Sequence, residues 1–223
     1  RSETGRRDLL GLEGEGLVKR VHGGAVLPHP VPEEPFKKRM GSNLREKKAI
    51  ARRAAQLITP GQCVFIDAGT TTSVFAHELA KIPGVSVVTN SIDIATTLYQ
   101  AGNHIEVLLL GGKVVSDVPG TYGELTLAEI ARFNADVAVT SPVALHPEQG
   151  AANFDLHEAE VARAMVSQAT KLTRVAAHHK LGTTSRVQSC TADQIDILGT
   201  SAGASKEALN TLSDHGVKKI ILT

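Results

Sequence analysis

The residues best suited to binding chemistry are Ile66 to Thr72, which read Ile-Asp-Ala-Gly-Thr-Thr-Thr. They follow the apolar run Val64-Phe65-Ile66 and precede a stretch of helical character that starts near Ser73. This order predicts a strand, a tight loop and a helix. The first N–H groups of a helix lack intrahelical partners, and the peptide dipoles make that end positive. Three threonine hydroxyls and a glycine at such a point predict a binding site for a phosphate or carboxylate.

Four more polar or glycine-rich loops border expected strands or helices. They are Thr89-Asn90-Ser91, Gly111-Gly112, Asn153-Phe154-Asp155 and His178-His179-Lys180-Leu181-Gly182. A parallel sheet brings the loops that follow its strands to one edge, so we expect these segments to converge. Each also has a structural alternative, since Thr-Asn-Ser is an ordinary helix cap and Asp155 with Glu158 fits a capping box. The glycine pair fits a turn, and Lys180 is either a phosphate ligand or a surface lysine.

Several other kinds of site are not predicted. The threonine loop is not a P-loop, because no Gly-Lys-Ser/Thr ending is present. His178 and His179 lack metal-ligand spacing with other residues, so neither a metal nor a cofactor is expected. Cys63 and Cys190 match no metal or redox spacing, which favours a reduced, cytoplasmic setting. No apolar run approaches the roughly 18 residues of a membrane span, and the start of the sequence has no secretory pattern.

The polar loops described above are expected to lie between alternating strands and helices. An apolar content of 42% with only 3% aromatic residues predicts a core of small aliphatic side chains. Strands are expected near residues 63–66, 85–88, 105–110, 136–140, 172–177, 195–199 and 218–222. Helices are expected near residues 36–58, 71–82, 92–101, 124–132, 156–170 and 204–215. This alternation predicts an α/β fold with a mostly parallel sheet and helices on both faces.

The charge of the chain is unevenly distributed. Residues 1–53 hold 13 Lys and Arg against 7 Asp and Glu, whereas residues 54–223 hold 11 against 16. A basic front and an acidic body suggest a polyanionic partner for the front, and the alternative is a solvated basic helix. Prolines in residues 27–35 predict an extended linker between the two parts.

The basic front has the pattern of a DNA-binding element. A short helix over residues 2–16 carries Arg6 and Arg7, and a basic hairpin that turns at Gly23-Gly24 follows it. A helix and hairpin of this kind match the recognition helix and wing of a winged helix-turn-helix. The alternative is an amphipathic arm that packs on a partner subunit. The sequence begins within this pattern, so it is expected to be a piece of a longer protein.

Several motifs of the chain, and their order along it, resemble those of the DeoR/GlpR family of bacterial transcription regulators. The resemblance begins in Ser2-Glu-Thr-Gly-Arg-Arg-Asp-Leu9 with Val21-His-Gly-Gly-Ala25 and continues through nearly the whole chain. Its further motifs are Asn43-x-x-Glu46-Lys47-x-x-Ile50-Ala51, Asp67-Ala-Gly-Thr-Thr-Thr72, Val88-Thr-Asn-Ser91, Leu109-Leu-Gly-Gly112, Ala135-Asp136, Glu158-Ala-Glu-Val161-x-Arg163-Ala-Met165 and Lys180-Leu-Gly182.

This resemblance implies a repressor of carbohydrate genes that binds a phosphorylated sugar. It implies a sensor fold similar to ribose-phosphate isomerases, glucosamine-phosphate isomerases and CoA transferases. The implied domains are the end of a DNA-binding domain (1–26), a linker (27–35) and a sensor (36–223). The implied effector-binding residues are Asp67, Gly69, Thr70, Thr71, Thr72, Thr89, Asn90, Ser91, Gly111, Gly112, Asp155, Glu158 and Lys180. The implied DNA-binding residues are Thr4, Arg6, Arg7, Lys19, Arg20 and His22.

Three segments depart from the family pattern. Gly5 replaces a usually apolar residue of the recognition helix. Ser141-Pro142-Val143-Ala144 replaces a glycine-containing turn, so Pro142 stiffens one wall of the expected pocket. Ala177-His178-His179 replaces an Asp-Ser-Ser run and removes an acceptor for ligand hydroxyls or for Lys180.

The leading hypothesis is therefore a ligand-switched repressor that binds operator DNA and has no enzymatic activity. A dimer or tetramer is expected, because paired DNA-binding heads read paired half-sites. The second is an enzyme, a sugar-phosphate isomerase or CoA-transferase relative. Asp67, Asp155 and Glu158 are available as acids or bases, but none has a catalytic motif around it. A third, a plain oligomerisation module, leaves the hydroxyl-lined loop unexplained.

Overall fold

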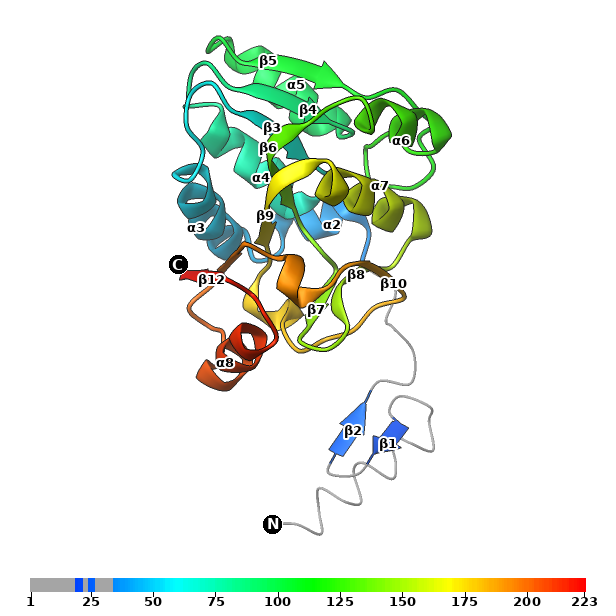
Figure 1. Cartoon of the computed structure of the whole chain (residues 1–223), viewed down its shortest axis with the longest axis vertical. Helices are drawn as coiled ribbons and strands as arrows, with labels where there is room; N and C mark the ends of the chain where they lie inside the picture. The colour runs from blue at the N-terminus through cyan, green and yellow to red at the C-terminus, as the bar shows by residue number, and fades with distance from the viewer. Residues whose placement is uncertain (1–18, 22–23, 27–33) are drawn as a thin grey trace. The chain divides into compact units, whose positions relative to one another are not determined.

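A computed structural model describes residues 19–21, 24–26 and 34–223 (Figure 1). The helix expected over residues 2–16 and most of the expected linker lie outside the described residues. The chain divides into two units, residues 1–33 and 34–223. In the first unit, β1 (Lys19–Val21) pairs with β2 (Gly24–Val26) in an antiparallel manner, with Val21 opposite Gly24. This pairing agrees with the hairpin expected from the sequence.

The second unit is built on a seven-stranded sheet in which every strand pair is parallel (Figure 1). The spatial order of its strands is β12 (Lys219–Leu222), β11 (Ile197–Thr200), β9 (Ala169–Val175), β6 (Ala135–Thr140), β3 (Cys63–Ile66), β4 (Ser86–Thr89) and β5 (Glu106–Leu109). The seven strands expected from the sequence are all present, so the predicted sheet is confirmed. Parallel pairing places the loops after the strands at one edge of the sheet.

Helices cover both faces of this sheet. They are α2 (Phe36–Gly41), α3 (Leu44–Ala55), α4 (Thr70–Leu79), α5 (Ile92–Ala101), α6 (Glu124–Ile130), α7 (Leu156–Ser167), α8 (Lys206–Asp214) and the short 3₁₀ helices η1 (His178–Lys180) and η2 (Ala192–Gln194). One apolar core joins α3, α4 and α5 to Val64 and Ile66 of β3, and a second joins α6, α7 and α8 to Phe65. Alternate residues of β3 thus face opposite cores, as expected for a strand buried on both sides.

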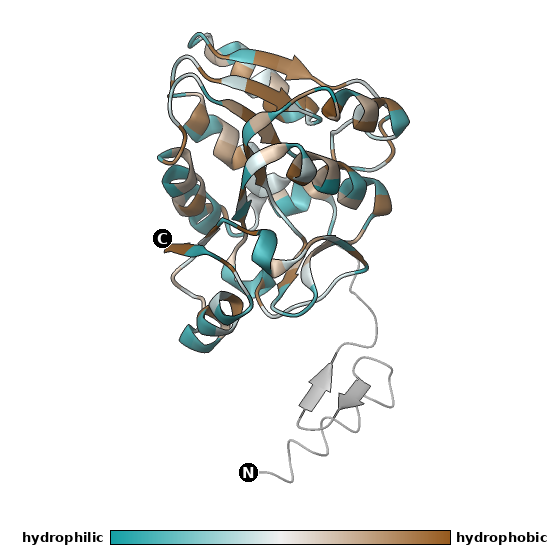
Figure 2. Ribbon diagram, in the orientation of Figure 1, coloured by the Kyte–Doolittle hydropathy of each residue, from teal (hydrophilic) through white to brown (hydrophobic). Residues whose placement is uncertain are grey.

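The distribution of hydropathy follows these layers. Hydrophobic colour runs along the central strands, whereas α8 is largely hydrophilic (Figure 2). Among the described residues, every helix is too short or too polar to cross a membrane.

The single long helix expected over residues 36–58 is wrong. The structure has α2 and α3 instead, separated at Ser42 and Asn43. Asn43 adopts a left-handed conformation with φ of 53°, which asparagine tolerates better than most residues and which cannot continue an α-helix. The spacing of apolar residues continues through this break, so the apolar pattern of residues 36–58 did not predict two separate helices.

Sequence reasoning also missed a small antiparallel sheet. Its strand order is β10 (Val187–Cys190), β8 (Gly150–Asn153) and β7 (Ala144–His146). These strands are short and rich in alanine, glycine, serine and glutamine, so they lack the β-branched runs that identify strands. Ala151 and Cys190 belong to the same core as α7.

Candidate functional site

The helix α4 begins directly at the threonine loop. Gly69 is its N-cap in an extended conformation, and no side chain caps the helix. The first turn of α4 buries three threonines, Thr70, Thr71 and Thr72. Buried hydroxyl groups normally have a hydrogen-bond partner. Thr72 Oγ1 donates to the carbonyl oxygen of Gly69 at 3.0 Å. Thr71 Oγ1 has no hydrogen-bond partner among the described residues. The start of α4 therefore offers uncapped N–H groups and an unused hydroxyl, which together suit an anion.

Asp67 connects this loop to the loop after β6. Its two carboxylate oxygens accept the backbone N–H of Ser141 at 3.2 and 3.1 Å. The side chain is buried, and this burial raises the pKa of Asp67 to about 7. The positive charge of Arg174 is the strongest of the opposing influences, followed by the Ser141 N–H bond. Asp67 is thus an acceptor whose charge depends on what binds beside it.

Arg174 is a site residue that sequence reasoning missed. It lies in β9 opposite Thr140 of β6 and is fully buried. Its Nη2 donates to Ser189 Oγ at 2.9 Å and to Cys190 Sγ at 3.2 Å. Its Nε and Nη1 have no hydrogen-bond partner among the described residues. An arginine inside the apolar run 172–177 was the available signal, because arginine is almost never fully buried without a partner.

Thr89, Asn90 and Ser91 are brought beside the α4 loop, where their side chains hold the structure together. Thr89 Oγ1 donates to the carbonyl oxygen of Ile66 at 2.7 Å. Asn90 Oδ1 accepts the N–H of Ala68 at 3.0 Å, so the two loops are directly connected. Ser91 caps α5 by accepting an N–H from its first turn at 3.2 Å. The cap expected as the structural alternative for this segment is therefore present.

The glycine pair packs against α6 rather than lying open. The N–H of Gly111 donates to Glu129 Oε2 at 2.6 Å. Gly112 has φ of +145°, and a Cβ at that position would lie 2.2 Å from Thr126 Oγ1 and 2.7 Å from the carbonyl oxygen of Tyr122. Only glycine fits both the conformation and the space.

Acidic groups at the start of α7 lie within electrostatic reach of the residues described above. Asp155 is the N-cap of α7 and accepts the N–H groups of His157 and Glu158. Burial raises the pKa of Tyr122, and the negative charges of Glu158, Asp67 and Asp155 raise it further. These three carboxylates therefore lie within electrostatic reach of one tyrosine hydroxyl.

Lys180 lies at the end of η1, next to the stiffened turn after β6. Its Nζ donates to the carbonyl oxygen of Pro142 at 2.6 Å. Its charge also helps to lower the pKa of Asp67, although less than Arg174 does. Lys180 is thus within electrostatic reach of the α4 loop, although it follows β9, which β6 separates from β3 in the sheet.

Comparison with known proteins gives the family. A model of the DeoR C terminal sensor domain matches residues 42–202, and a model of the DeoR-like helix-turn-helix domain matches residues 2–31. The chain belongs to the DeoR family. All thirteen effector-binding residues inferred from the sequence fall inside the DeoR sensor match, and all six DNA-binding residues fall inside the helix-turn-helix match.

A curated relative agrees with this assignment, and two solved structures are similar to the chain in fold. The "Glycerol-3-phosphate regulon repressor" of Escherichia coli (strain K12) is 32% identical over 216 residues, which are 97% of this chain and 85% of that protein. A crystal structure of eIF2B beta from Chaetomium thermophilum has a TM-score of 0.50 and 16% identity, and covers 78% of this chain and 54% of that chain. Ribose 5-phosphate isomerase A from Methanocaldococcus jannaschii has a TM-score of 0.45 and 15% identity, over 62% and 55% of the chains.

The six DNA-binding residues inferred from the sequence all precede the described sensor unit. Thr4, Arg6, Arg7 and His22 lie outside the described residues. Lys19 and Arg20 lie in β1, the first strand of the hairpin.

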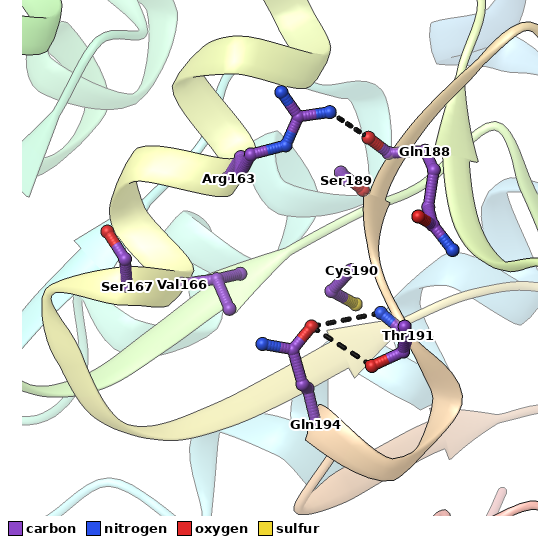
Figure 3. Close-up of a pocket in the computed structure, with 8 residues that line it drawn as sticks. All are labelled: Arg163, Val166, Ser167, Gln188, Ser189, Cys190, Thr191 and Gln194. Carbon is purple, nitrogen blue, oxygen red and sulfur yellow. Dashed lines mark hydrogen bonds between the residues drawn. The ribbon is translucent and has the colours of Figure 1, made fainter.

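A separate cavity of about 210 Å³ lies between α7 and β10 (Figure 3). Arg163 extends over it from α7 and donates to the carbonyl oxygen of Gln188. Ser189 and Cys190 also line it, and both are hydrogen-bonded to Arg174. The effector-binding residues inferred from the DeoR resemblance are absent from its lining, so this cavity does not correspond to the predicted site.

Proposed function

We propose that the protein is a DNA-binding repressor of carbohydrate genes whose second unit binds a phosphorylated sugar. The observation that carries this proposal is the start of α4. There an uncapped helix end, a buried hydroxyl of Thr71 without a described partner and the carboxylate of Asp67 lie in one loop. A phosphate matches the first two groups, and sugar hydroxyls match the third.

In this proposal the phosphate accepts hydrogen bonds from the N–H groups of Thr70 to Thr72. The sugar hydroxyls donate to Asp67, which becomes more fully ionised when it gains these donors. Lys180 and Arg174 supply positive charge toward the bound anion, as their effect on Asp67 indicates. Thr89, Asn90 and Ser91 act by holding the loops together. Gly111 and Gly112 complete the wall by packing on α6.

The named relative supports the class of effector. A repressor of a glycerol-3-phosphate regulon is 32% identical over 97% of this chain. Glycerol 3-phosphate combines a phosphate with hydroxyl groups, which is the same pair of functions that the α4 loop offers. We therefore assign a small phosphorylated sugar or polyol as the effector class.

Regulation requires that the effector favours one arrangement of the DNA-binding heads. We assign residues 1–26 to the head, 27–35 to a linker and 36–223 to the sensor. Coupling between such sites typically amounts to about 1–3 kcal/mol. Operator DNA is the partner of the head, which places the protein in the cytoplasm.

An exposed apolar edge supports assembly into dimers or tetramers. The strand β5 ends the sheet, and Leu108 and Leu109 on it are 41% and 44% exposed. Tyr99 on the adjacent helix α5 is 82% exposed. Figure 2 shows β5 as a hydrophobic strand at the outer edge of the sheet. A second copy of the chain would cover this edge by presenting the same surface in a two-fold arrangement.

The enzyme alternative is less well supported by the site. Asp67 is bound to the Ser141 N–H, and Asp155 caps α7, so two of the three candidate acids have structural roles. The family model that covers the sensor is one of transcription regulators. We therefore propose binding without turnover.

Calorimetric titration tests this function. A panel of sugar and polyol phosphates would be titrated into the chain, each beside its unphosphorylated counterpart. The proposal expects saturable binding of at least one phosphorylated member and at least hundredfold weaker binding of its counterpart. Equal binding of both counterparts, or binding of none with no effect of inorganic phosphate on melting, would contradict it.

A further inference from the structure

Three side chains that commonly ligate metals meet between α3 and η1. They are Glu46, in the first turn of α3, and the adjacent His178 and His179. Their candidate ligand atoms all lie within 4.8 Å of one another. Glu46 is separated from His178 by 132 positions in the sequence, so spacing alone did not predict this cluster.

Neighbouring groups fix the geometry of the cluster. His178 Nδ1 lies 2.8 Å from Glu46 Oε1 and 3.1 Å from Ser201 Oγ. The hydroxyl of Ser201 also donates to Glu46 Oε1. Gly203 packs against the ring of His178, because a Cβ there would lie only 2.9 Å from Nδ1. The two imidazole rings are nearly perpendicular, with centroids 5.9 Å apart. Supporting contacts of this kind orient the ligands in metal sites.

We propose that Glu46, His178 and His179 bind a divalent transition-metal ion such as Zn²⁺. Two imidazoles and one carboxylate match the ligands that zinc takes, at about 2.0–2.2 Å from the ion. Ligand atoms of a tetrahedral site then lie about 3.4 Å apart, so small side-chain rotations bring these three into place. With three protein ligands, the fourth position stays open to water or an anion. One carboxylate and two nitrogens do not suit Mg²⁺ or Ca²⁺, which prefer oxygen.

The exposure of the Glu46, His178 and His179 cluster, and the charges beside it, affect its affinity for a metal ion. The side chains of His178 and Glu46 are 42% and 17% exposed, so an ion can reach them from solvent. Lys47 and Lys180 lie close enough to His179 for their charges to act on it, and they oppose a further cation. The site is therefore expected to bind zinc more weakly than a closed structural zinc site does.

A metal here would join two parts of the sensor. Glu46 belongs to α3, whereas His178 and His179 belong to the same short helix as Lys180. The ion would hold α3 against the loop that carries an effector-binding candidate. This inference concerns a second ligand and does not depend on the assignment of the sugar phosphate.

Metal titration of the whole chain tests the proposal. Zn²⁺ and Mg²⁺ would be titrated separately in chelator-treated buffer, and Co²⁺ would report ligand geometry through its visible absorption. Variants would be His179→Ala, Glu46→Gln and the control His215→Ala, whose imidazole lies at the end of α8. Glu46→Gln keeps an acceptor for Ser201 and His178, so it preserves the network without the charge.

The proposal expects one Zn²⁺ or Co²⁺ per chain and no Mg²⁺ binding. Affinity for Zn²⁺ would fall at least tenfold in His179→Ala and Glu46→Gln and would be unchanged in His215→Ala. Equal melting temperatures without metal would show that the variants fold. Zinc affinity in His179→Ala equal to that of the unmodified chain, or no Zn²⁺ binding by the folded unmodified chain, would overturn the proposal.

Discussion

The carboxylate of Asp67 binds the backbone N–H of Ser141 through both of its oxygens, at 3.2 and 3.1 Å. This contact joins the loop after β3 to the loop after β6, which are neighbouring strands of the sheet. It also holds a buried acid beside the start of α4, where an anionic ligand is proposed to bind. The ionisation of Asp67 is therefore linked both to folding and to ligand binding.

The first prediction concerns the pH dependence of stability. Burial raises the pKa of Asp67 from 3.8 to about 7. Between these values the folded chain keeps a proton that the unfolded chain has released, so the free energy of unfolding falls as pH rises through this range. The fall is on the order of a few kcal/mol and stops above pH about 7. Urea unfolding at several pH values measures it.

Asp67→Asn is the control for this prediction, since other carboxyl groups also titrate. The difference in unfolding free energy between the unmodified chain and the variant should decline from pH 4 to pH 7 and then level off. Parallel curves for the two proteins across this range would show that Asp67 is ionised normally.

The second prediction separates ligand binding from folding at two threonines. Thr71→Val removes a buried hydroxyl that has no partner among the described residues, so stability without ligand should stay the same or rise slightly. Affinity for the sugar phosphate should fall at least fivefold, because the phosphate loses a donor. Thr89→Val instead removes the bond to the Ile66 carbonyl and should cost about 1–3 kcal/mol of stability. Melting curves and calorimetry measure both; unchanged affinity in a folded Thr71→Val would refute the assigned role.

The third prediction concerns the glycine pair. Gly112→Ala places a Cβ 2.2 Å from Thr126 Oγ1 in a backbone conformation that alanine rarely adopts. We expect a loss of about 3 kcal/mol of stability. Gly41→Ala is the matched control, because no atom lies within 4 Å of its added Cβ at the end of α2. That change should be neutral or stabilise by up to about 1 kcal/mol. Similar losses in both variants would contradict the packing described for Gly112.

The fourth prediction concerns assembly. Leu109→Lys adds a charge to the exposed edge strand β5 and should shift the protein from dimer or tetramer toward monomer. Leu156→Lys is the control, since Leu156 is similarly exposed at the start of α7, a helix of the other apolar core. Light scattering after size exclusion measures both masses. The same mass for Leu109→Lys and the unmodified chain would place the interface elsewhere.

The parallel sheet could be predicted because its strands are apolar runs separated by helical periodicity. The helix expected near residues 92–101 is present as α5, which Ser91 caps and Gly102 ends in a left-handed conformation. The break between α2 and α3 was missed because it depends on the left-handed conformation of Asn43. The small sheet was missed because its pairing is set by tertiary contacts rather than by β propensity.

For the candidate site, the sequence predicted which loops lie together but not most of the contacts between them. The threonine loop was identified because a helix start after a buried strand has known chemistry. The roles of Thr89 and Asn90 in joining loops depend on distant carbonyl and N–H groups, which no local pattern contains. Arg174 and the cluster around Glu46 come together only through the fold, so residue types alone did not reveal them.

The most direct test of the central claim is a crystal structure grown with the sugar phosphate that binds most tightly in calorimetry. The account predicts phosphate density within hydrogen-bond distance of the backbone N–H groups of Thr70 to Thr72, with Asp67 facing the sugar hydroxyls. Phosphate density at another place, with side chains packed across the start of α4, would contradict it.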